Sequence, residues 1–344
     1  MPTVTSTLSP AGPNGGRGRA KPLRPLIPAL ALALLAAFAP ISGVAIPHPP
    51  GALAAGASGR LLLPRDSGLS VLDLASRNEQ PLYTTQQPVL GAIWSPDGSR
   101  VAFSQFGKVP GDRYGSANLY LLDGGQATPA IMRTGPDDFL SNPVWTSDGQ
   151  ALLYEAQAAG TGGFSVEQAA LDGSDRRTIE RNGRMPALSP DGSLLAFVRM
   201  TNDTVLVVRP LAGGAPRELM APDKFIGISY PRFSPDGQRV AFLGIGGTAD
   251  PSPVPLNPLS WFHPGAGGAL AHGIPWDPWI VNLDGSGLRR VADLAADDPA
   301  VAWAPDSSAL AILGGDGLWL LPLDGSGGPN LISNGSYGVL DWRP

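Results

Sequence analysis

The side chains best suited to acid–base or metal chemistry in this 344-residue sequence are its three histidines, His48, His263 and His272. Imidazole can act as a general base near neutral pH or bind a metal ion. His263 and His272 lie in one stretch, residues 246–277, so a metal or general-base role can be considered there. Two histidines in a single loop do not match a metal-dependent active site. We therefore expect no metal and no catalytic residue.

Other catalytic chemistry finds little support in the composition. The sequence contains no cysteine, which excludes a thiol nucleophile, a disulfide and a thiolate zinc site. It also contains no Gly-x-Ser-x-Gly nucleophile elbow and no phosphate-binding loop. We expect no cofactor. Whether the protein is an enzyme stays open, and a non-enzymatic role is favoured.

Aspartate recurs in one phrase, illustrated by Trp94-Ser95-Pro96-Asp97-Gly98. In such a phrase the proline presets φ, the aspartate bonds its own backbone and the glycine accepts a positive φ, so a tight turn results. The phrase lacks the alternating oxygen ligands of a calcium loop. We therefore interpret the recurring aspartates as structural turn residues: Asp97, Asp148, Asp191, Asp236 and Asp306.

Each phrase belongs to a longer unit that must hold these turns. An aromatic residue or leucine ends one predicted strand, the turn follows, and a short apolar run predicts a second strand. A further turn, for example Leu171-Asp172-Gly173-Ser174, then closes a second hairpin. Each unit is thus predicted to be four antiparallel strands, a to d. The aspartates at 97, 148, 191 and 236 are spaced like the four-stranded blades of a β-propeller, which repeat at about 40–45 residues.

The two ends of the chain supply complementary parts of one more unit. Residues 338–342 form only a strand a, whereas residues 60–63, 69–74 and 80–83 read as strands b, c and d. Five complete units and one shared unit predict an all-β, six-bladed propeller of four-stranded antiparallel blades. Pairing of the N- and C-terminal strands would close the ring and leave no long exposed sheet edge.

The repeat resembles that of TolB-type propellers, relatives of WD-repeat propellers, over roughly residues 59–344. This resemblance rests on the Trp-Ser-Pro-Asp-Gly turn, the following Leu-Ala-Phe type of strand and the Leu-Asp-Gly-Gly turn. It implies an extracytoplasmic propeller that binds other proteins. TolB itself carries an α/β domain before its propeller, and we expect no such domain in residues 1–58.

The longest predicted connection is the b–c loop 246–277 of the fourth full unit. It is rich in proline and aromatic residues, and loops of this length are often functional. The b–c and d–a connections share one face, so this loop is expected beside other loop ends there. Alternatively, Trp261 and Trp276 fold back as a plug over the mouth of the propeller. The candidate binding residues are Trp261, Phe262, His263, His272, Trp276, Trp279, Tyr114, Phe139 and Phe225.

The N-terminus predicts the compartment. Four basic residues between 17 and 24 precede an apolar run, residues 26–39, of signal-peptide length. Extended to residue 46, the run could span a bilayer. Residues 1–46 are therefore a signal peptide or a membrane anchor preceded by basic residues, predicted as a hydrophobic helix, and residues 47–58 a linker. Both alternatives place the propeller, residues 59–344, outside the cytoplasm, because the positive flank stays inside.

The composition and net charge of the chain limit the kinds of partner that the protein can bind. Hydrophobic residues make up 43% of the chain, charged residues 15%, and the net charge is −5, with no basic patch after residue 24 for nucleic acid. We interpret the protein as a monomeric, extracytoplasmic protein-interaction module, and the cell envelope is a candidate location. If residues 26–46 are not cleaved, they would attach the protein to the membrane. The alternative is a propeller enzyme or carbohydrate-binding protein that uses the channel mouth and the 246–277 loop.

Overall fold

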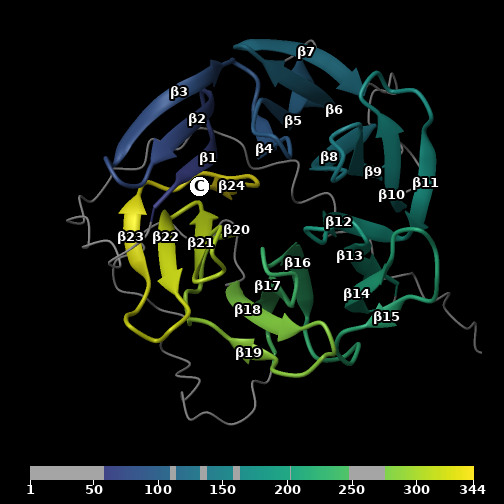
Figure 1. The fold of residues 1–344 in the computed structure, drawn as a ribbon, viewed down its shortest axis with the longest axis vertical. Coiled ribbons are helices and arrows are strands. Elements are labelled where there is room, and N and C mark those ends of the chain that lie inside the picture. Colours follow the sequence, from purple (N-terminus) through teal and green to yellow (C-terminus); the bar gives the residue numbers. More distant parts are fainter. Residues whose placement is uncertain (1–57, 109–113, 132–137, 158–162, 202, 248–275) are drawn as a thin grey trace, which may run out of the picture. The chain divides into compact units, whose positions relative to one another are not determined.

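A computed structural model describes residues 58–108, 114–131, 138–157, 163–201, 203–247 and 276–344. Residues 48–344 form one unit of the chain. All regular elements in the described residues are β-strands, arranged around a common centre (Figure 1). The expected N-terminal helix lies outside the described residues. None of the described segments is a helix long and apolar enough to cross a membrane.

Strands at equivalent places in the repeats occupy equivalent places in the fold. The strands nearest the centre, called inner strands, are β4 (Val89–Trp94), β8 (Phe139–Trp145), β12 (Gly183–Leu188), β16 (Gly227–Phe233), β20 (Ala300–Trp303) and β24 (Asp341–Arg343). Next to them lie β5 (Arg100–Lys108), β9 (Ala151–Gln157), β13 (Leu194–Met200), β17 (Arg239–Ile245), β21 (Ala309–Gly314) and β1 (Arg60–Arg65).

The third strands are β6 (Tyr114–Asp123), β10 (Phe164–Ala170), β14 (Thr204–Pro210), β18 (Asp277–Asn282), β22 (Gly317–Pro322) and β2 (Gly68–Asp73). The outer strands are β7 (Gln126–Ile131), β11 (Arg177–Arg181), β15 (Arg217–Glu218), β19 (Arg289–Arg290), β23 (Asn330–Ser333) and β3 (Asn78–Thr84). Hydrogen bonding joins these strands into four sheets of four strands and one sheet of eight. The eight-stranded sheet holds two antiparallel groups of four, joined by a single parallel pair, Ala117 with Phe139.

The chain ends meet as the sequence predicts. Strand β24 pairs antiparallel with β1, with Leu61 opposite Trp342, so the C-terminal strand completes the sheet β24-β1-β2-β3. The observed strand spans Asp341–Arg343 rather than the predicted 338–342, because Val339 turns instead to β4. There the Val339 N–H donates to Leu90 O and the Ala92 N–H donates to Val339 O, each at 3.1 Å. The closing segment therefore binds both sheets that flank it.

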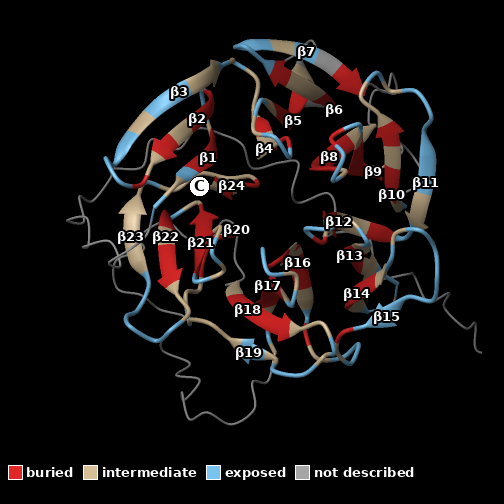
Figure 2. Cartoon of the chain, viewed as in Figure 1, coloured by how far each residue is buried: buried red, intermediate tan, exposed pale blue. Residues whose placement is uncertain are grey.

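The core lies between neighbouring groups of strands. One apolar cluster, for example, joins Val198 and Leu206 of one group to Phe242 and Trp279 of the next. The middle strands of each group are mostly buried, whereas most residues of the outer strands are intermediate or exposed (Figure 2). The recurring strand-b aromatics, Phe103, Tyr154, Phe197 and Phe242, have no exposed surface, which confirms their predicted packing role. Burying one such side chain contributes about 1.5–3 kcal/mol.

The recurring tryptophans also link adjacent groups. The indole N–H of Trp145 donates to Ile93 O at 3.3 Å, and that of Trp303 donates to Arg232 O at 2.9 Å. In each case the acceptor lies on the preceding inner strand. The guanidinium of Arg239 lies 4.9 Å from the Trp303 ring centroid, within the range of a cation–π contact. Trp145 and Trp303 thus each fasten their own inner strand to the preceding one.

Candidate functional site

Four of the sequence-predicted binding residues, Trp261, Phe262, His263 and His272, lie outside the described residues. Trp276 is the first described residue after Gly247 and is half-buried. It exchanges two backbone hydrogen bonds with Ala296, at 3.2 and 3.0 Å. Its ring approaches the backbone of Gly227 at the start of β16. Trp276 therefore fastens the beginning of β18 to the connection before β20.

Two further predicted binding residues are core residues in the structure. Trp279 is 1% exposed and packs edge-to-face on Phe225, with ring centroids 4.9 Å apart and an interplanar angle of 85°. Phe225 makes a similar contact with Phe242. Trp279 stands opposite Phe242 in the β17–β18 register, and because Phe242 has no exposed surface, the two rings share the core. Trp279 and Phe225 therefore belong to the core and not to an exposed binding surface.

The remaining predicted residues lie in the eight-stranded sheet. Tyr114 begins β6 opposite Lys108, and its side chain is outside the description. Phe139 begins β8, is half-buried and packs edge-to-face on Phe106 at a centroid distance of 5.6 Å. The structure thus brings Trp276, Trp279 and Phe225 together around β16–β18 and places Phe139 two groups away.

The five turn aspartates share one geometry. In each, a carboxylate oxygen accepts the backbone N–H of the residue two positions later, at 3.0 Å: Ser99, Gln150, Ser193, Gln238 and Ser308. The hydroxyls of Ser189 and Ser193 and the Ser193 N–H stabilise the carboxylate of Asp191 and lower its pKa to about 2. The predicted backbone hydrogen bonds are therefore present, and these carboxylates are occupied within their own turns.

The sequence reasoning missed a group of charged side chains on and beside the inner strands. We call Glu155, Arg184, Tyr230, Arg232 and Asp341 the inner-strand cluster. Several of its members lie at or beside bulges of the inner strands. At each bulge a residue with positive φ precedes a proline: Asn142 (51°), Met185 (52°) and Tyr230 (48°). The X-Pro step that precedes three of the five turn phrases, by three or four residues, was the signal in the sequence for these bulges.

One half of this cluster is fully satisfied. The Glu155 side chain is 1% exposed and accepts the Arg184 guanidinium at 2.9 Å. Its second oxygen accepts the Met185 N–H at 2.9 Å and the Asn142 amide at 3.2 Å. Arg184 also lies over the Phe164 ring at 4.0 Å. Glu155 thereby ties the inner strands β8 and β12 together, as a buried ion pair does only when its hydrogen bonds are complete.

The other half of the cluster is not saturated. The Asp341 carboxylate accepts the Trp94 and Trp342 N–H groups, each at 3.0 Å, and burial raises its pKa. Burial also lowers the pKa of Arg232, whose charge is felt by Asp341 and Tyr230. Burial raises the pKa of Tyr230, and the charges of Asp298 and Glu155 add to the rise. Tyr230 and Arg232 are both half-buried, so they keep contact with solvent.

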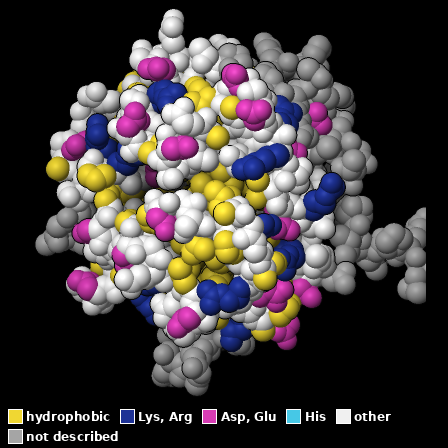
Figure 3. Space-filling view, turned by 45° about the vertical axis from the view of Figure 1, so that its right-hand side comes forward, with side chains coloured by type: hydrophobic (Ala, Val, Ile, Leu, Met, Phe, Trp, Pro, Cys, Tyr) yellow, Lys and Arg dark blue, Asp and Glu magenta, His cyan; other side chains and the backbone are white. Residues whose placement is uncertain are grey.

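The face that carries the b–c and d–a connections also has the large exposed apolar side chains of the described residues, Met200 at 39% and Ile226 at 78%. Met200 ends β13 before a b–c connection, and Ile226 lies in the d–a connection that leads into β16. Strands β13 and β16 are in contact. Figure 3 shows that apolar side chains gather toward the middle of the view, with charged side chains around them.

The same face has an acidic group near the closing segment. The Tyr337 hydroxyl donates to Asp297 at 2.8 Å, and Asp316 lies in the β21–β22 hairpin beside them. Burial raises the pKa of Asp316 to about 6, and the charge of Asp297 adds to the rise. No group of three or more metal-ligating side chains occurs in the part of the chain that the structure describes.

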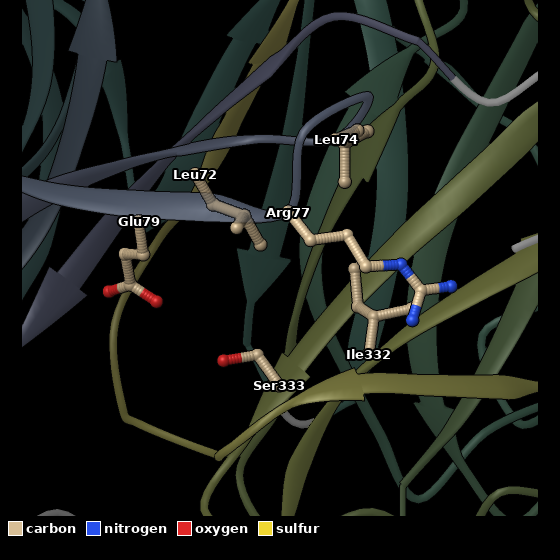
Figure 4. A pocket seen from close by; sticks show the side chains of 6 residues that line it. All are labelled: Leu72, Leu74, Arg77, Glu79, Ile332 and Ser333. Atoms are coloured by element: carbon tan, nitrogen blue, oxygen red, sulfur yellow. The ribbon is translucent and has the colours of Figure 1, made fainter. Parts of the chain in front are cut away.

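A small pocket of about 90 Å³ lies between the shared sheet and β23, lined by Leu72, Leu74, Arg77, Glu79, Ile332 and Ser333 (Figure 4). Its carboxylate is already occupied, since Arg65 binds Glu79 in bidentate fashion at 2.7 and 2.8 Å. Arg65 also donates to Asn334 O at 3.0 Å. The pocket is therefore the edge of a packing contact that helps to close the ring.

Comparison with known proteins places this architecture among the β-propellers. No protein-family model matches the sequence, and none of the curated proteins matches it. Among solved structures, TolB from Acinetobacter baumannii superposes with a TM-score of 0.62 at 17% identity, over 83% of this chain and 67% of that one. A TolB candidate from Agrobacterium tumefaciens superposes with a TM-score of 0.58 at 15% identity, over 84% and 100%.

A nidogen/laminin complex gives a TM-score of 0.61 at 12% identity, covering 83% of this chain and 98% of that one. At these identities the likeness shows the fold. The chain has the fold of TolB-type β-propellers, which confirms the resemblance predicted from its repeats.

Proposed function

We propose that this protein is a six-bladed, extracytoplasmic β-propeller that binds a protein partner over the face carrying its b–c and d–a connections. The blade number follows if each four-stranded group is one blade and the eight-stranded sheet counts as two. The basic and apolar N-terminal residues, 17–46, support a location outside the cytoplasm. The similar TolB and nidogen/laminin structures are consistent with a protein-binding role, the second being a complex of two proteins.

The observation that carries this proposal is the exposure of Met200 and Ile226 on one face. Ile226 is a β-branched residue whose side chain is 78% exposed, although its own N–H is held by Ile245 O at 2.9 Å. Its position is therefore fixed by the fold. The two side chains belong to neighbouring groups of strands, and exposed apolar side chains with polar groups around them are typical of protein interaction surfaces. The opposite face consists of short turns whose aspartates are occupied by their own backbone.

The test is capture of partners from a cell-envelope extract by the full chain and by a double variant, Met200→Glu with Ile226→Asp. We expect the wild-type protein to retain discrete partners that the double variant loses. The matched control adds two negative charges to the opposite face, Gln150→Glu with Ala212→Asp, and should capture as the wild type does. Equal capture by all three proteins would contradict the proposed face. Turnover of a polysaccharide would instead favour the enzymatic alternative.

A further inference from the structure

Arg232 is a charged side chain that makes no ion pair with a described residue, although the buried Asp341 carboxylate acts on it from a greater distance. Within the described residues its guanidinium has one hydrogen bond, from Nη1 to Pro231 O at 2.9 Å, and no ion pair within 4.0 Å. It is half-buried on the inner strand β16. A guanidinium carries five N–H donors in a planar fork. Most of these donors are therefore available on a side chain that has lost part of its hydration, which is costly unless a partner replaces it.

Tyr230 brings a second free donor to the same strand. Its backbone has a φ of 48° at the β16 bulge, a left-handed value outside the range of a regular β-strand, and its N–H is directed at Met185 Sδ at 3.3 Å. Its hydroxyl makes no hydrogen bond with any described residue. The charge of Arg232 acts on this phenol, which places the two side chains in one electrostatic environment. The bulged strand β16 thus carries two side chains with free donors, two positions apart along the chain.

The surrounding charges indicate what those donors can bind. Arg184 is neutralised by Glu155, and Asp341 is held by two backbone N–H groups. Asp298 and Asp341 are the other acidic groups felt by Tyr230 and Arg232. With one arginine free and these carboxylates nearby, a monoanion is favoured over a multiply charged group. The planar fork of arginine matches a carboxylate in bidentate geometry.

We propose that Arg232 and Tyr230 form a carboxylate-binding site, which receives an acidic side chain or a C-terminal carboxylate of the protein partner. The assignment of the carboxylate to a partner rests on the proposed function. The site itself rests on the unsatisfied donors of β16. Arg232 supplies charge and a two-point contact, and the Tyr230 hydroxyl supplies a third hydrogen bond.

The test follows the Arg232 Nε–H signal in the nuclear magnetic resonance spectrum of the full chain, identified by its absence in Arg232→Lys. The probes are acetyl-glutamate amide for a side-chain carboxylate, acetyl-glycine for a terminal carboxylate, inorganic phosphate, and neutral acetyl-glutamine amide. We expect a saturable shift with at least one carboxylate and none with the neutral amide. Titrations at constant ionic strength exclude screening as the cause.

Variants then assign the contacts. Loss of a charged hydrogen-bonding partner should weaken carboxylate binding roughly 10- to 100-fold in Arg232→Met, read from Tyr230 signals. Tyr230→Phe should weaken it by a smaller factor, and Asp341→Asn should strengthen it by removing a like charge. Arg289→Met removes an exposed arginine from the outer strand β19 of the same group and should leave binding unchanged.

Two results would overturn the site: equal shifts with the acetyl-glutamate and acetyl-glutamine probes, or phosphate binding tighter than both carboxylates. If Arg232→Met does not fold, the titration of the wild-type protein and of Tyr230→Phe still tests whether the carboxylate site exists. Carboxylate binding at Arg232 together with unchanged partner capture by the Met200→Glu/Ile226→Asp variant would refute the proposed face and leave the site standing. Lost capture without carboxylate binding would do the reverse.

Discussion

At the residue scale, the recurring acidic side chains divide by what surrounds them. The turn aspartates accept backbone and hydroxyl donors within their own turns, so hydrogen bonds lower their pKa values, as for Asp97 and Asp191. Asp316 and Asp341 lie where burial is the largest influence, and their pKa values rise. The first kind of aspartate stabilises a turn in its charged form. For the second kind, burial disfavours the charged form, so these aspartates are the better candidates for a response to a ligand or to pH.

Replacing Asp236 by alanine tests the structural role of the turn aspartates. The change removes the acceptor of the Gln238 N–H and the contact with the Ser234 hydroxyl. We expect a loss of about 1 kcal/mol in the free energy of unfolding, measured by urea denaturation. Asp236→Asn keeps one acceptor oxygen and should lose less. Carboxylate binding or partner capture that disappears at unchanged stability would show that Asp236 has another role.

A pH dependence of stability is expected from Asp316. Its pKa in the folded protein is raised to about 6 from the ordinary value of 3.8, so folding favours the protonated form. That contribution is complete below the unfolded pKa and is lost as the pH rises through the folded value. Asp297, Asp298 and Tyr337 are the titratable groups around it. The melting temperature should therefore fall between about pH 4 and about pH 7 more steeply in the wild type than in Asp316→Asn. Parallel profiles would contradict this.

At the element scale, the turns of neighbouring repeats touch. A Cβ placed on Gly149 would contact Pro96 of the preceding turn, and one on Gly237 would contact Pro190. Both distances, 3.7 and 3.8 Å, are ordinary van der Waals contacts, so the positive φ is the reason for glycine at these two positions, and only a closer neighbour would add a second reason. Short turns of neighbouring repeats thus lie in contact on the a–b face.

Two glycines with similar φ values allow the cost of the backbone conformation to be measured separately from the cost of a close neighbour. Gly192 has a φ of 73° and faces Ser147, whose Oγ would lie 2.6 Å from an added Cβ, whereas Gly325 has a φ of 77° and no neighbour within 4 Å. Gly325→Ala should cost about 1–2 kcal/mol for its backbone alone. Gly192→Ala should cost roughly 1 kcal/mol more, for overpacking. Adding Ser147→Gly should recover that excess. Equal costs at both sites, measured by denaturation, would show that the turns do not press on each other.

The elements were largely predictable from the sequence, and the candidate site was only partly so. Pro-Asp-Gly and Asp-Gly turns specify hairpins locally, so the four-stranded units and the join between the chain ends could be predicted. The exposure of an aromatic side chain depends on strand register, and for this reason Trp279 and Phe225 were assigned to the surface although they are buried. Arg232 was missed because it occurs in one repeat, and its importance arises from a bulge and from Asp341 on another strand.

At the scale of the whole molecule, stability depends on closure. Neighbouring inner strands contact each other all the way round, including β24 with β4 and with β20. Besides the β1–β24 pairing, the Trp342 indole donates to Ser58 O at 3.0 Å and Arg65 donates to Asn334 O. The two chain ends are thus held by main-chain and side-chain contacts together. Removing residues 338–344 would leave the edge of β1 unpaired and would free the backbone groups of β4 that bond to Val339.

Deletion of residues 334–344 should therefore lower the melting temperature of the whole unit and not merely loosen one end. The deletion removes β24, the Val339 bridge to β4 and the Arg65 acceptor. Circular dichroism should show one cooperative transition shifted to lower temperature. Deletion of Pro344 alone, an exposed residue, is the control and should melt as the wild type does. An unchanged melting temperature after the longer deletion would refute the closed ring.

The most direct measurement of the central claim is amide hydrogen exchange of the protein alone and in complex with a captured partner. The account predicts new protection at the b–c and d–a connections, around Met200 and from Phe225 to Gly227, and at the inner strand β16. It predicts no change in the turns that contain Asp97 and Asp191 on the opposite face. Protection confined to those turns, or to the outer strands, would contradict the proposed binding face.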